Sequence, residues 1–186
     1  MNIITSTQLK QHLKKFSSAD LLKDILSLFQ KYSDVKEYYQ IKLSSSGNRE
    51  LCEQYKMKIK NEFFPVRGLG KMRLSVARKA IVDFKRMSTD VHCVADIMVY
   101  YVEMGVNFTK EYGDINELFY NSMERMYEEA AKFVTKNKIA NEYAGRFWKM
   151  VDDTFDMGWG FNEGLESIFE KYFSKILGTE SIGEIL

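Results

Sequence analysis

Residues 51–84 read LCEQYKMKIKNEFFPVRGLGKMRLSVARKAIVDF, a stretch that contains a helix, a loop and a second helix. On both sides of the loop, apolar residues recur every three or four positions, which is the spacing of an amphipathic helix. Pro65 is the one proline of the chain, and because it lacks a backbone N–H it should end the first helix near Phe63. The stretch therefore predicts two helices joined by a loop over residues 63–73.

The same apolar spacing continues outward from this stretch over almost the whole chain. The predicted helices span about residues 6–16, 17–32, 33–43, 48–63, 74–88, 90–110, 114–136, 139–157 and 162–177. We expect Ser17 and Asp20 to form a capping box at the start of the second helix, and Asp114 to cap the seventh. Connections this short favour antiparallel neighbours. We therefore predict an all-α fold, an irregular array of eight or nine antiparallel helices that forms a degenerate α-hairpin solenoid, with a compact helical bundle as the alternative.

A chain of 186 residues is long enough to bury a core, so we predict a single all-helical domain over residues 1–178. Residues 179–186 follow a glycine and are predicted to form a flexible C-terminal tail. The expected core includes Leu118 and Phe155, and the two glycines beside Trp159 are expected to let its indole pack inward.

Charge is sorted along the chain. Residues 1–86 contain 18 Lys or Arg and 8 Asp or Glu, a net charge of +10, whereas residues 87–186 contain 9 and 18, a net charge of −9. The formal total of +1 hides this asymmetry. Such sorting bears on partners and docking and says little about the fold.

Several classes of chemistry are excluded by the residue types and their spacing. The two cysteines lack CxxC spacing, and His12 and His92 lack the neighbours of a Glu-x-x-His or HExxH site. The sequence therefore predicts no metal, no cofactor and no catalytic residue. Because the first residues become charged early and no later segment has 18 uninterrupted apolar residues, we expect a cytoplasmic protein without a membrane partner.

Three strings carry a family resemblance: EFFPVRGLGKMRLSVARKAIVDFK at residues 62–85, YYVEMGVNFTKEYGDI at residues 100–115 and DTFDMGWGF at residues 153–161. Together they resemble an uncharacterised bacterial family, a domain of unknown function, over roughly residues 5–175. The resemblance implies a cytoplasmic all-helical protein and implies no activity.

The loop after Pro65 is a candidate site for an anion or a partner, because glycines expose backbone amides and a following helix start attracts anions. The candidate residues are Arg67, Gly68, Gly70, Lys71, Arg73, Arg78 and Lys79. A strict phosphate-binding loop is excluded, since the positions that need Gly and Ser or Thr hold Pro65 and Met72. A structural turn followed by a solvated basic helix is the alternative.

A second candidate is the acidic turn formed by Asp152, Asp153, Asp156 and Trp159. Asp152 and Asp156 lie one helical turn apart, and paired carboxylates can bind Mg²⁺ or Ca²⁺. The turn lacks the alternating ligands of a calcium loop, so a solvated helix face is the alternative interpretation.

The sequence favours a non-enzymatic helical protein-interaction or scaffold module with a protein partner, because its charges are sorted and no catalytic constellation is present. Self-association through the oppositely charged halves is one form of this hypothesis. Nucleic-acid or phosphate-ligand binding through residues 49–86, with 11 basic and 4 acidic residues, is one alternative. An enzyme or small-ligand binder with a helical cleft is the other.

Overall fold

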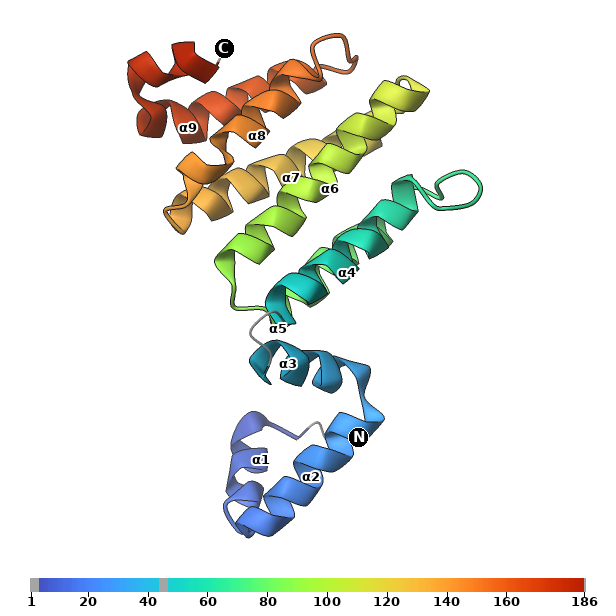
Figure 1. Ribbon diagram of the computed structural model, residues 1–186, viewed down its shortest axis with the longest axis vertical. Coiled ribbons are helices and arrows are strands. Elements are labelled where there is room, and N and C mark those ends of the chain that lie inside the picture. The colour runs from blue at the N-terminus through green and yellow to red at the C-terminus, as the bar shows by residue number, and fades with distance from the viewer. Residues whose placement is uncertain (1–3, 44–46, 186) are drawn as a thin grey trace. The chain divides into compact units, whose positions relative to one another are not determined.

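The computed structural model describes residues 4–43 and 47–185, with side chains described through residue 174 (Figure 1). These residues form nine helices and no strand, which confirms the predicted all-α class. The helices are α1 (Ser6–Leu13), α2 (Ser18–Lys31), α3 (Ser33–Leu43), α4 (Gly47–Phe63), α5 (Leu74–Met87), α6 (Val91–Tyr112), α7 (Glu117–Lys136), α8 (Ala140–Asp152) and α9 (Phe161–Ile185).

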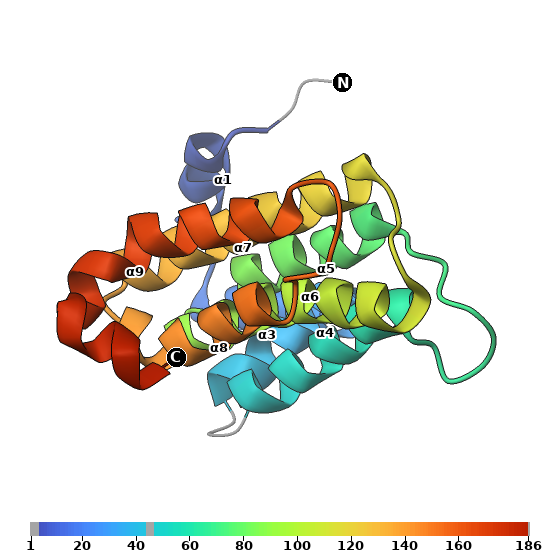
Figure 2. The ribbon, with the colours of Figure 1, turned by 90° about the horizontal axis from the view of Figure 1, so that it is seen from above.

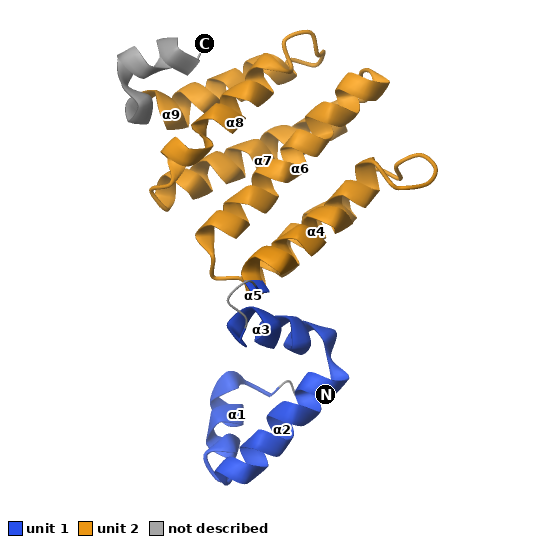
Figure 3. Cartoon of the chain, in the orientation of Figure 1, with its two compact units in different colours: residues 1–47 blue, residues 48–186 orange. Residues whose placement is uncertain are grey.

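The chain divides into two compact units, residues 1–47 and residues 48–186 (Figure 3). The first unit contains α1, α2 and α3, and none of the residues in these helices is buried. The second unit, which we call unit 2, contains the buried core. The single domain over residues 1–178 stays a prediction.

The core of unit 2 consists of apolar faces of antiparallel helices, with α6 packed between α5 and α7 (Figure 2). Aromatic rings join the helices. Phe63 of α4 meets Tyr101 of α6 with ring centroids 5.8 Å apart, and Phe147 of α8 lies 4.8 Å from both Tyr127 of α7 and Phe173 of α9. Each of these five rings is at most 2% exposed, so the periodic apolar stripes do form the core.

Helix caps explain several boundaries. Ser17 and Asp20 form the predicted capping box at the start of α2. The predicted cap of α7 is wrong, because Asn116 rather than Asp114 accepts the bond from the Phe119 backbone N–H, at 3.0 Å. Asp114 instead accepts hydrogen bonds from the Tyr120 hydroxyl of α7 and from the Gly158 backbone N–H.

α8 ends earlier than the sequence predicted. The fully buried Thr154 donates its hydroxyl to the carbonyls of Met150 and Val151, both at 2.9 Å, and Asn162 Nδ2 donates to the Val151 carbonyl at 2.7 Å. These side chains satisfy the last carbonyls of the helix, so the chain can leave it after Asp152. At the other end of the chain, α9 continues through Gly178, the predicted stop. The flexibility of residues 179–186 stays a prediction.

Three expected core residues are exposed instead. Leu118 is 80% exposed, Phe155 is 79% exposed and Trp159 is 61% exposed. On α7 the buried face begins at the next residue, Phe119. Phe155 and Trp159 lie beyond the end of α8, where helical periodicity no longer decides which side chains face inward.

Candidate functional site

Three connections of unit 2 lie at the same end of its helices (Figures 1 and 2). They are residues 64–73 between α4 and α5, residues 113–116 between α6 and α7, and residues 153–160 between α8 and α9. We call this end, together with the helix turns that flank the three connections, the loop end. Antiparallel helices bring the chain back to the same end after every second helix, so segments far apart in sequence meet there.

The α6–α7 connection lies between the other two. On one side, the Phe64 ring stacks on the Tyr112 ring at the end of α6, with centroids 6.3 Å apart. On the other side, Asp114 Oδ1 accepts hydrogen bonds from Gly158 N at 3.2 Å and from the Tyr120 hydroxyl at 2.7 Å. The loop end is therefore one continuous surface rather than three separate loops.

Large apolar side chains are exposed at the loop end. Six of them are at least half exposed: Val66 (89%), Leu69 (80%), Tyr112 (50%), Leu118 (80%), Phe155 (79%) and Trp159 (61%). Among the residues of unit 2 whose side chains the structure describes, the other exposed large apolar residues are Met57, Val76 and Val82, and each is less than half exposed. Single exposed apolar residues are ordinary, whereas a group of this size at one end is typical of an interaction surface.

The basic part of the loop end is the tip of the α4–α5 connection. Among the described residues, Arg67 and Lys71 form no hydrogen bond or ion pair through their side chains. Arg73 is different, because its Nη2 and Nε hold the buried Glu62 carboxylate at 2.7 and 3.0 Å. The hydrogen bonds from Arg73 outweigh the effect of burial and lower the pKa of Glu62.

The two glycines of this connection shape it. Gly68 adopts φ +76°, a conformation that side chains with a Cβ rarely take. Gly70 packs directly on the end of α4, where a Cβ would lie 2.1 Å from the Phe63 carbonyl oxygen. The loop therefore packs back against the end of α4, where the Met72 backbone N–H donates to the Glu62 carbonyl at 2.8 Å.

The other two predicted anion-binding residues are engaged along α5. Arg78 donates to Glu129 at 3.0 Å and to the Ser122 carbonyl at 3.3 Å. Lys79 pairs with Asp83 one turn further on, at 2.6 Å. The seven residues proposed from the sequence thus do not form one charged group, because three of their five cations already have acidic partners.

The acidic part of the loop end borders a cavity of about 430 Å³ between the α6–α7 and α8–α9 connections. Its lining includes Phe155, the carboxylates of Asp114, Asp152, Asp153 and Asp156, and one cation, Lys110. Of the described residues, none forms a hydrogen bond or ion pair with the side chain of Asp152 or Asp156. The cavity therefore carries uncompensated negative charge beside an exposed aromatic ring.

Asp153, by contrast, is neutralised within the fold. Its carboxylate accepts hydrogen bonds from Lys110 at 2.7 Å and from Lys149 at 3.2 Å. Burial alone would raise the pKa of Asp153, but these bonds outweigh burial and lower it. The predicted acidic turn consequently splits into one structural carboxylate and two that remain open to solvent and partners.

Trp159 is held outward by a strained backbone. Its φ is +64°, in the left-handed region that disfavours residues other than glycine. The strain accompanies exposure of a large indole rather than its burial, and such combinations cluster at functional positions.

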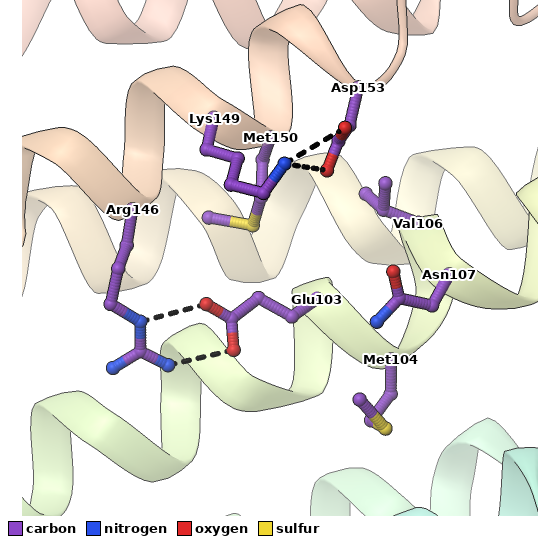
Figure 4. Close-up of a pocket in the computed structure, with 8 residues that line it drawn as sticks. All are labelled: Glu103, Met104, Val106, Asn107, Arg146, Lys149, Met150 and Asp153. Atoms are coloured by element: carbon purple, nitrogen blue, oxygen red, sulfur yellow. Dashed lines mark hydrogen bonds and ion pairs between the residues drawn. The ribbon is translucent and has the colours of Figure 1, made fainter. Parts of the chain in front are cut away.

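A second cavity, of about 150 Å³, lies between α6 and α8 (Figure 4). Glu103 and Arg146 face each other in it and form two parallel hydrogen bonds of 2.7 Å (Figure 4). Arg146 also pairs with Asp96, which in turn pairs with Lys56 of α4. This chain of alternating charges fastens α4, α6 and α8 together, and it leaves the cavity lined by groups that are already paired.

Beside this network, Cys52, Glu53 and Asp96 offer ligand atoms within 4.8 Å of one another. Lys56 already supplies the positive charge, since its ammonium group pairs with both carboxylates. Burial raises the pKa of the Cys52 thiol to about 12, so the thiol stays protonated at neutral pH and binds metal weakly. We assign this group a structural role.

None of the described helices is long and apolar enough to cross a membrane.

The fold and its loop end define the class of protein: an all-helical chain whose antiparallel helices present one apolar surface with charges of both signs. The chain belongs to a family of unknown function, DUF6155, whose model matches residues 4–173. The match includes the whole loop end and confirms the family resemblance noted from the three strings. A comparison with curated proteins and one with solved structures gave no match.

Sequence reasoning named charged residues of the loop end and Trp159, but it missed the other five exposed apolar residues. Val66, Leu69 and Tyr112 were not proposed as functional, and Leu118 and Phe155 were assigned to the core. One signal in the sequence could have indicated that Phe155 is exposed. Its ring precedes Asp156 and two glycines, a pattern that indicates the end of a helix. For Val66 and Leu69, which lie in a loop, neither helical periodicity nor a helix end indicates exposure.

Proposed function

We propose that the chain is a non-enzymatic protein-interaction module that binds a partner protein with its loop end, in the cytoplasm. One observation carries this proposal: six large apolar side chains, each at least half exposed, lie together at that end. Aromatic and large aliphatic residues surrounded by charged ones are the usual composition of a binding surface.

Two further observations support the same role. The charged groups in the interior of unit 2 are paired, as in the network of Arg146, Glu103 and Asp96, whereas unpaired charges lie beside the exposed apolar residues. In addition, Asp114 ties two of the three connections together by hydrogen bonds to Tyr120 and Gly158, which preorganises the surface.

The experiment is affinity capture from lysate of the native cell with the full chain as bait, in three forms. The double variant Phe155→Ser, Trp159→Ser removes two anchors of the loop end. The matched control Met57→Ser, Val82→Ser removes two exposed apolar residues of α4 and α5 that lie outside the loop end. We expect a protein that the wild type and the control retain and that the loop-end variant loses by about tenfold or more.

Equal retention by the loop-end variant, or equal loss by both variants, would contradict the proposal. Thermal unfolding of all three forms shows whether the fold is intact, and since the substituted residues are exposed, their unfolding free energies should agree within about 0.5 kcal/mol.

A further inference from the structure

The loop end carries two surfaces that complement each other and that lie apart within one molecule. The first, which we call the basic tip, consists of Val66, Arg67, Leu69 and Lys71 in the α4–α5 connection. The second, which we call the acidic pocket, consists of the cavity bordered by Asp152, Phe155 and Asp156, and Trp159 belongs to the same α8–α9 connection. Among the described residues, no ion pair joins the basic tip to the acidic pocket.

The α6–α7 connection separates the basic tip from the acidic pocket, and the helix turns beside it carry the exposed Tyr112 and Leu118. The same strip also holds the exposed acidic residues Glu111, Asp114 and Glu117. Figure 1 shows the α6–α7 connection between the other two connections, so the order across the loop end is the basic tip, the strip that carries Tyr112 and Leu118, and the acidic pocket. Such a surface is complementary to a second copy of itself in a face-to-face twofold dimer. The twofold axis lies in the interface, perpendicular to the line that runs from the basic tip to the acidic pocket. The rotation brings each basic tip onto an acidic pocket and apolar residues onto apolar residues.

We propose that two copies of this chain associate through their loop ends in a closed twofold dimer, each basic tip seated against the acidic pocket of the other copy. This inference rests on the proposed function of the loop end as a protein-binding surface, and it names the partner as a second copy.

Charge and shape support this occupant over an unrelated protein. Among the described residues, Arg67 and Lys71 form no side-chain hydrogen bond or ion pair, although the charge of Lys71 also acts on Glu62. The side chains of Asp152 and Asp156 form none either, so each of the two contacts in the dimer brings two cations to two carboxylates. The cavity of about 430 Å³ can receive a long basic side chain. Complementary charges at the rim fix the register and speed association, while the exposed apolar residues supply the buried area.

The test uses the full chain and two charge-reversed forms, followed by light scattering coupled to gel filtration. The first form carries Arg67→Glu and Lys71→Glu, and the second carries Asp152→Lys and Asp156→Lys. We expect a dimer mass for the wild type at low salt. Each variant alone should have a monomer mass, because reversal places like charges at both contacts of its twofold dimer.

Mixing the two variants at equal concentration is the decisive step. In the mixed pair, an acidic tip meets a basic pocket and a basic tip meets an acidic pocket, so we expect the dimer mass to return. Recovery would also show that both variants are folded. A control that exchanges Lys79→Glu with Asp83→Lys on α5 should keep the wild-type mass, because this ion pair lies outside the loop end.

A wild-type mass that stays monomeric at about 100 μM protein and 50 mM salt would overturn the dimer, as would variants that stay dimeric alone or that fail to pair when mixed. The capture experiment separates this failure from failure of the proposed function. If the wild type is monomeric yet the Phe155, Trp159 variant still loses a captured protein, the loop end binds a different protein and only the dimer is wrong.

Discussion

The two ends of the helices in unit 2 are built in different ways. At the end opposite to the loop end, residues 88–90 and 137–139 make short connections. Asp90 caps α6 through the amides of His92 and Cys93, at 2.9 and 3.0 Å, and Ile139 is 8% exposed. At the loop end, the α4–α5 and α8–α9 connections are longer and their apolar side chains face outward.

This difference teaches that helix packing alone does not expose apolar residues in this fold. The same helices enter both ends, yet one end buries its apolar side chain and satisfies its polar groups locally. Exposure at the loop end is therefore a property of its connections, and natural chains retain such exposure where a surface binds something.

The largest effect that sharpens the comparison concerns two phenylalanines eight positions apart. Phe147→Ala should lower the free energy of unfolding by about 3–5 kcal/mol, because the ring is fully buried between Tyr127 and Phe173. Phe155→Ala should change it by less than about 0.5 kcal/mol, because that ring is exposed. Urea unfolding of both variants measures this, and a large loss for Phe155→Ala would mean that the loop end is part of the core.

A smaller effect is expected at the basic tip. Gly70→Ala should cost about 1–3 kcal/mol, because the new Cβ would meet the backbone oxygen of Phe63, which cannot move without shifting α4. The matched control is Gly145→Ala in α8, where nothing lies within 4 Å of the new Cβ. There, higher helix propensity should stabilise the chain by up to about 1 kcal/mol. Thermal unfolding distinguishes the opposite signs, and a loss at both positions would be evidence against the close packing of Gly70.

Each end of the helices in unit 2 has a residue at positive φ, so relieving the strain at each position allows a direct comparison of the two ends. Trp159→Gly and Lys138→Gly each replace a residue at positive φ, +64° and +61°, so each should stabilise the fold by about 0.5–1 kcal/mol. Only Trp159→Gly should weaken binding, since Lys138 lies at the opposite end. Unfolding and the dimer mass are measured for both variants, and an equal loss of binding would refute the assignment of binding to the loop end.

The smallest expected effect is a dependence on pH. The folded-state pKa of Glu62 lies below its ordinary value of 4.5, so its pair with Arg73 stabilises the fold above that pH. This contribution is lost as the pH falls through the lowered pKa. Glu62→Gln should therefore be less stable than the wild type at pH 7, and the difference should shrink toward pH 3. A difference in urea midpoint that is the same at both pH values would show that the carboxylate charge is not responsible.

Most of the helices could be predicted from the sequence because periodicity and caps are local. The loop of residues 63–73, the capping box of Ser17 and Asp20, and the end of α6 at Gly113 all depend on neighbours within a few positions. The charged residues of the candidate site were likewise visible. The phase of α7 at Leu118 and the end of α8 at Asp152 were not. The first depends on whether Asp114 or Asn116 caps the helix, and the second depends on Asn162 of α9 reaching back to the Val151 carbonyl.

The sequence by itself determined an all-α chain, the family it belongs to, and a basic and an acidic segment of unknown relation. Only the tertiary structure decided that these segments lie at one end of unit 2, separated by the α6–α7 connection, and that Phe155 and Trp159 point outward there. The physical reason is that periodicity reports which face of a helix is apolar, whereas in a connection the direction of each side chain depends on backbone turns and on contacts between distant residues.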